Sequence, residues 1–142
     1  MRGFSLALAI TGIAGAAVAQ DYVDPPRGYV NGSATSTPAT PGVKTQAETA
    51  IRGYFSSDGL KFRAERVRIA TSVTRGFDQR IAGPISIVCG EYRQPDAPDD
   101  YRSYAWFYVA IKKSDVLWSE ADTVADGHSM AYDDCQGAGM TN

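Results

Sequence analysis

The sequence predicts an α+β domain in which one N-terminal helix packs on an antiparallel sheet of three or four strands, with one disulfide bond. Apolar residues recur at helical spacing between positions 45 and 57. They alternate with polar residues, as in half-buried strands, over 67–73 and 101–113. The chain also carries two cysteines, Cys89 and Cys135, downstream of an apparent export signal. Together these features indicate one small domain that is crosslinked by a disulfide bond.

Residues 1–19 have the pattern of a signal peptide. Arg2 supplies a positive start, residues 4–18 form an apolar run, and Ala17 and Ala19 are small residues at the positions that a signal peptidase reads. The run is shorter than the roughly 20 apolar residues of a membrane span. We therefore expect cleavage after Ala19, a periplasmic or secreted localisation, and no integral membrane segment in the mature chain.

Residues 20–42 are predicted to be a disordered linker rich in Pro, Ser, Thr and Gly. They show no apolar periodicity, so they offer too little apolar surface to offset their ordering entropy. The linker is interpreted as a tether, or as a docking segment anchored by Tyr22, Val23, Tyr29 and Val30. Asn31 begins an N-glycosylation pattern that matters only in a host that glycosylates. A single domain over 43–142 then follows.

The predicted helix covers residues 45–57. Thr45 and Glu48 form a capping box, in which the hydroxyl and the carboxylate each satisfy a free backbone N–H. Asp58 and Gly59 are expected to end the helix. Its one-sided apolar stripe must pack on a sheet, and comprises Ala47, Ala50, Ile51, Tyr54 and Phe55.

The first predicted strand covers 67–73, and the residues before it are out of phase, which predicts a bulge or bend near Glu65. A loop over 76–84, a strand over 85–92 and an acidic hairpin loop over 94–100 follow. The longest strand covers 101–113, residues 115–118 form a short strand or a turn, and 129–135 form one helical turn. The last connections are too short for parallel crossovers, so the pairing is expected to be antiparallel.

The two cysteines are predicted to form a disulfide, because exported proteins meet an oxidising compartment. A structural metal site needs about four ligands, and His128 is the only histidine. We therefore expect neither a metal nor another cofactor. The net charge of −2 and the scattered basic residues argue against a nucleic-acid partner.

One face of the 101–113 strand is aromatic and flanked by cations. It carries Arg102, Tyr104, Trp106 and Tyr108, and such side chains are enriched at interfaces. We interpret these four as a binding surface for a protein partner, a peptide or a glycan. Two alternatives remain: the rings form cross-strand pairs on a solvated face, or the C-terminal tail covers them.

Evidence for catalysis is weaker. Glu91 is either a general acid or the partner of Arg66, Arg68 or Arg102 in an ion pair, and the ion pair is favoured. His128 lies near Asp126 and Ser129, but no G-x-S-x-G or H-E-x-x-H motif is present. The acidic loop lacks the ordered spacing of a calcium site, and its carboxylates belong to Asp96, Asp99 and Asp100.

Several short motifs resemble a diffuse set of small exported bacterial proteins of unassigned function. They are Asp58-x-x-x-Phe62-Arg63, Val88-Cys89-Gly90-Glu91 and Tyr101-x-x-Tyr104-x-x-Phe107. The resemblance extends over about residues 43–111. It implies export and an α+β fold, and it implies no catalytic residue.

The sequence therefore favours a non-enzymatic exported binding protein that acts through the aromatic face. An inhibitor and an accessory subunit of an envelope or secretion complex are both forms of this hypothesis. The alternatives are a small hydrolase that uses Glu91 or the region around Asp126 and His128, and a structural envelope component. Self-association through an exposed edge strand is also open.

Overall fold

The computed structural model describes residues 29–31, 37–75, 79–123 and 130–141. Their order of elements is β1 (Tyr29–Asn31), β2 (Thr37–Pro38), α1 (Pro41–Phe55), β3 (Lys61–Arg75), β4 (Gln79–Arg93), a short 3-10 turn η1 (Tyr101–Ser103), β5 (Ala105–Lys112), β6 (Asp115–Ala121) and α2 (Met130–Gly137).

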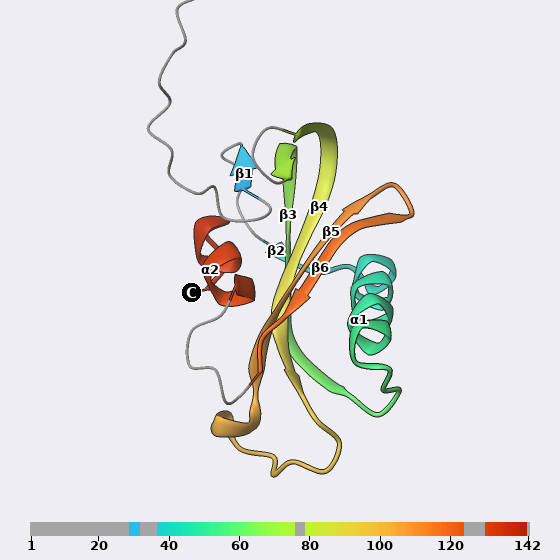
Figure 1. Ribbon diagram of the computed structural model, residues 1–142, viewed down its shortest axis with the longest axis vertical. Helices are drawn as coiled ribbons and strands as arrows, with labels where there is room; N and C mark the ends of the chain where they lie inside the picture. Colours follow the sequence, from blue (N-terminus) through green and yellow to red (C-terminus); the bar gives the residue numbers. More distant parts are fainter. Residues whose placement is uncertain (1–28, 32–36, 76–78, 124–129, 142) are drawn as a thin grey trace, which may run out of the picture.

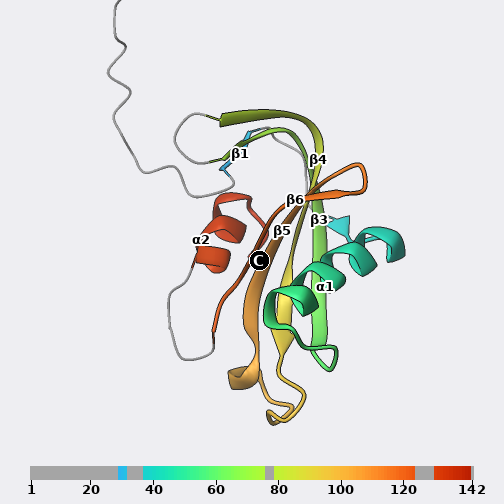
Figure 2. The ribbon, with the colours of Figure 1, turned by 45° about the vertical axis from the view of Figure 1, so that its right-hand side comes forward.

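The sheet is antiparallel throughout the described residues, in the order β1-β3-β4-β5-β6, with β2 also paired to β3. Its four longer strands, β3 to β6, follow one another along the chain. Helix α1 lies on one face of the sheet and α2 on the other (Figures 1 and 2). The predicted α+β class and antiparallel sheet are confirmed. The main helix is not the first element, however, because two short strands precede it.

Two described parts of the predicted linker, β1 and β2, pair with the sheet. Val30 lies opposite Val73, and Thr37 lies opposite Val67. Without these strands the outer side of β3 would present a longer row of unpaired backbone groups. Such pairing depends on a distant strand and leaves no periodic signal in a short, proline-bearing segment. The predicted signal peptide, Tyr22, Val23 and residues 32–36 lie outside the described residues.

Helix α1 begins at Pro41, four residues before the predicted start. Proline suits this position because the first N–H of a helix has no intrahelical partner. The Thr45 hydroxyl donates to the Pro41 carbonyl at 2.9 Å, so the proposed capping box is wrong. The helix ends at Phe55, ahead of the predicted stop at Asp58, and is followed by Ser56, whose φ of 51° is left-handed.

The pairing of β3 with β4 shifts register between Arg63 and Arg66, and Ala64 has a positive φ of 55°. This confirms the predicted bulge near Glu65. Most of the predicted loop over 76–84 is strand instead, because β4 already begins at Gln79. The predicted fourth strand is longer, and the predicted C-terminal turn is the two-turn helix α2.

A hydrophobic cluster lies on each face of the sheet, between the strands and the helix that covers that face. The cluster under α1 contains Ala47, Ile51, Leu60, Val67, Val88, Tyr92, Ala105, Phe107, Val109 and Ile111. The cluster under α2 contains Ala70, Val73, Ile85, Ile87, Cys89, Tyr108, Ala110, Ala131, Cys135, Ala138 and Met140. Strand β5 supplies alternate residues to both clusters, so it is buried on both sides.

No helix among the described residues is long and apolar enough to cross a membrane.

Candidate functional site

The candidate site lies on the α2 side of the sheet, at the end nearest the β4–β5 loop. Arg63 of β3 pairs across the strands with Glu91 of β4, which in turn pairs with Trp106 of β5. Glu91 is two residues from Cys89, whose sulfur is bonded to Cys135 of α2. Side chains two residues apart on a strand share a face, so this row lies on the α2 side.

Arg63 and Glu91 form a bidentate ion pair. Nε of Arg63 lies 2.9 Å from one Glu91 oxygen and Nη2 lies 3.4 Å from the other. The hydrogen bond to Glu91 raises the pKa of Arg63. The predicted ion pair of Glu91 is thus confirmed, but its predicted partners were wrong. The register shift at the bulge brings Arg63, and not Arg66 or Arg68, opposite Glu91.

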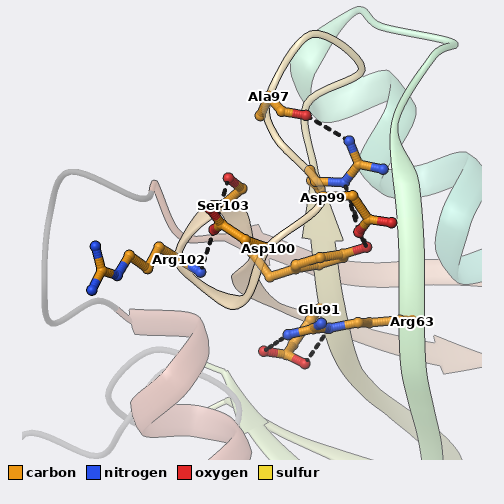
Figure 3. A network of polar contacts seen from close by, with 9 residues as sticks. Arg63, Glu91, Ala97, Asp99, Asp100, Arg102 and Ser103 are labelled. Carbon is orange, nitrogen blue, oxygen red and sulfur yellow. Dashed lines mark hydrogen bonds and ion pairs between the residues drawn. The ribbon is translucent and has the colours of Figure 1, made fainter.

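The ring of Tyr104 is held by two guanidinium groups. The Cζ of Arg63 lies 3.5 Å from the ring centroid and that of Arg93 lies 5.7 Å away. The Tyr104 hydroxyl donates to Asp99 at 3.0 Å and accepts from Arg93 Nε at 3.4 Å. Nη1 of Arg93 donates to the Ala97 carbonyl at 2.6 Å, which ties this cluster to the loop (Figure 3). Tyr104 is therefore fixed in place before any ligand binds.

Trp106 and Tyr108 have different environments although both are on β5. Trp106 is half-buried, and its ring meets that of Tyr132 on α2 edge-on at 5.8 Å. Tyr108 is fully buried beneath α2, and this burial raises its pKa. Tyr108 is therefore not part of an accessible face, which corrects the prediction. For this residue, the alternative that the C-terminal segment covers the rings applies.

Arg102 lies in η1 and not on β5. Its backbone N–H donates to the Asp100 carboxylate at 2.8 Å, and its Nε donates to the Tyr101 hydroxyl at 3.0 Å. Figure 3 shows its guanidinium directed away from the pair of Arg63 and Glu91. Arg102 therefore borders the site and does not continue the row of strand side chains.

The predicted acidic loop uses its carboxylates to order its own backbone. Asp100 accepts from the Ser103 hydroxyl at 3.3 Å as well as from Arg102, and Asp99 lies 3.6 Å from Arg93 Nε. Tyr101, at the end of this loop, is 72% exposed. Within the described ranges, no group of three or more histidine, cysteine or acidic residues is placed to hold a metal ion.

The predicted disulfide is confirmed. Cys89 and Cys135 are bonded, their Cα atoms lie 5.9 Å apart, and both residues are buried. The bond fastens α2 to β4, two residues along the strand from Glu91 of the candidate site. Asp126, His128 and Ser129 lie outside the described residues, so a hydrolytic role for that region stays a prediction.

Sequence reasoning missed four residues that shape the site. Arg93 lies two residues after Glu91 on β4, so the two side chains share a face. The spacing of strand residues could therefore have identified Arg93. Arg63 lies in the stretch that is out of phase before the bulge. Asp122 and Tyr132 come together only in the fold, where the Asp122 carboxylate accepts the N–H of Tyr132 at 2.9 Å. We name the resulting set the aromatic–arginine surface: Arg63, Glu91, Arg93, Tyr104, Trp106 and Tyr132.

Comparison of the chain with protein-family models, curated proteins and solved structures found no match. The resemblance to small exported bacterial proteins therefore stays a prediction.

Proposed function

We propose that this protein is a non-enzymatic, exported binding domain that holds a protein partner on the aromatic–arginine surface. The observation that carries the proposal is the Tyr104 ring, fixed between Arg63 and Arg93. Tyrosine, tryptophan and arginine are the residues that most often dominate binding energy at protein interfaces. A surface that is ordered in advance loses less side-chain entropy when it binds.

The exposure of these groups supports the same proposal. The side chain of Arg63 is 40% exposed although it makes a bidentate ion pair, so part of the side chain stays accessible to a partner. Tyr101 and Arg102 border the surface from the ordered β4–β5 loop. These two exposed side chains extend the surface beyond the sheet and suit a partner with a concave, carboxylate-bearing face.

Export is part of the proposal. The pattern of residues 1–19 and the disulfide together support a periplasmic or secreted location, because stable disulfides are characteristic of oxidising compartments. An inhibitor and an accessory subunit of an envelope complex remain the two forms that such a binding domain takes.

Site-specific photo-crosslinking in the native host tests this function. A crosslinking residue placed at position 104 or 106 should trap one discrete protein. The same residue at position 54 should not, because Tyr54 is an exposed side chain on α1, over the opposite face of the sheet. Equal trapping from position 54, or no adduct from 104 and 106, contradicts the proposal.

Affinity measurements on the trapped partner sharpen the test. Trp106→Ala should weaken binding by roughly 30-fold or more, as expected for a residue worth about 2 kcal/mol. Tyr54→Ala is the matched control and should leave the affinity unchanged. Circular dichroism of both variants checks that the fold survives, because Trp106 also packs on Tyr132.

A further inference from the structure

Glu65 is a buried carboxyl group beneath α1, on the face of the sheet opposite the aromatic–arginine surface. The bulge at Ala64 turns it inward, and only 5% of its side chain is exposed. Its stem lies over Gly90, because a Cβ built on Gly90 would come within 3.0 Å of Glu65 Cγ. The same Cβ would meet the Phe107 ring at 2.8 Å, so the stem of Glu65 packs beside this apolar ring.

Among the described residues, the charged groups that act on the Glu65 carboxyl are Lys44 and Glu48, both on α1. Nζ of Lys44 lies 3.6 Å from one Glu65 oxygen and 3.9 Å from Glu48. Glu48 is itself bonded to Arg52 at 3.2 Å. The second oxygen of Glu65, Oε1, has no hydrogen-bond partner among the described residues. The cluster thus holds two carboxyl groups and two cations, but Arg52 pairs with Glu48, and Lys44 lies too far from Glu65 for a hydrogen bond.

A proton on Glu65 removes the repulsion between the two neighbouring carboxylates. Protonated Glu65 can donate a hydrogen bond to Glu48, whose carboxylate also lies beside Lys44 and Arg52. Burial raises the pKa of Glu65 above its usual 4.5, and this hydrogen bond raises the pKa by a smaller amount. Loss of the proton leaves two neighbouring carboxylates, one of them removed from water, under the helix.

We propose that the contact between α1 and the sheet is a proton-linked clamp, in which Glu65 keeps a proton that it donates in a hydrogen bond to Glu48 while α1 is seated, and a rise in pH loosens the helix. When α1 lifts, Glu65 returns to water and to its usual acidity. The seated form therefore binds the proton more tightly than the open form, so acid favours the seated helix.

The pH range over which α1 loosens follows from the higher pKa of Glu65 in the seated form. Below the usual value of 4.5, both forms are protonated and the clamp is fully closed. As pH rises above that value, the seated form loses stability until its own pKa is passed, and the loss then levels off. Each pH unit between the two pKa values lowers protection of α1 about tenfold.

Helix α2 provides an internal control. It is held by the Cys89–Cys135 bond and by the carboxylate of Asp122, which accepts the N–H groups of Ala131 and Tyr132. None of these contacts involves Glu65 or Glu48. Local opening of α1 should therefore not change the protection of α2.

Hydrogen exchange of the purified, disulfide-bonded protein tests the clamp. After correction for intrinsic chemistry, protection of the buried amides near Ala47 and Ile51 should fall as the pH rises from about 5 to about 8. Protection of α2 should stay constant. Equal loss in both helices, or no loss in either, overturns the proposal.

Three variants locate the effect. Glu65→Gln should abolish the pH dependence of α1 protection, and Glu48→Gln should reduce it because burial of Glu65 remains. Asp115→Asn, which removes an exposed carboxylate at the β5–β6 turn, should retain it. Carbon-13 titration of the Glu65 carboxyl in the unmodified protein provides evidence that needs no variant to fold. A midpoint clearly above 4.5 is expected, and a midpoint at or below that value overturns the proposal.

Discussion

The carboxylate of Asp122 accepts the backbone N–H of Ala131 at 2.9 Å, although the two residues are separated by the segment 124–129. Its second oxygen accepts the N–H of Tyr132 at the same distance. Asp122 is itself fixed, since its N–H donates to the Trp106 carbonyl and its carbonyl accepts the Tyr92 hydroxyl. One buried carboxylate therefore joins the start of α2 to β5 beside the aromatic–arginine surface.

Replacing this carboxylate should weaken the attachment of α2. Asp122→Ala is expected to lower the free energy of unfolding by about 1–2 kcal/mol, the usual cost of losing a helix cap. Chemical denaturation measures this change. Asp133→Asn is the matched control, because it removes an exposed acidic group from the first turn of the same helix. It should cost less than about 1 kcal/mol, and an equal cost for both variants contradicts the role of Asp122.

Loss of the disulfide should destabilise the whole domain. The bond closes a loop with a sequence separation of 46 residues, which corresponds to about 4 kcal/mol on the chain-entropy model. The double variant Cys89→Ser, Cys135→Ser should therefore unfold at a markedly lower denaturant concentration. A reducing agent should shift the unfolding midpoint of the unmodified protein and leave that of the double variant unchanged. If the midpoint of the unmodified protein also stays constant under conditions that reduce the bond, the disulfide contributes little stability.

Gly90 is required by close packing, because a Cβ at this position would lie 2.8 Å from the Phe107 ring. Gly90→Ala should destabilise the domain by about 1–3 kcal/mol through overpacking. The matched control is Gly53→Ala in α1, where a Cβ would meet nothing within 4 Å. That change should stabilise the helix by up to about 1 kcal/mol. Thermal unfolding distinguishes the two, and a neutral Gly90→Ala would show that the Phe107 ring moves at little cost.

The helix, the strands and the disulfide follow from local sequence because each has a local or compartmental cause. Apolar spacing located α1 and the central strands, since periodicity reflects which face is buried. The break in alternation before Val67 located the bulge, because an extra residue shifts every later side chain to the other face. The cysteine count and the export pattern together indicated the Cys89–Cys135 bond.

Tertiary structure decided how these elements meet. The pairing of β1 and β2 with β3, the cover of α2 over Tyr108 and the capping of α2 by Asp122 all join residues that are distant in sequence. Composition and spacing describe what a segment tends to do alone, whereas these contacts depend on what the folded chain brings beside it. The pairing of Glu91 with Arg63 illustrates the difference. The sequence favoured an ion pair for Glu91 over a role as general acid, and the register set by the bulge selected Arg63 as its partner.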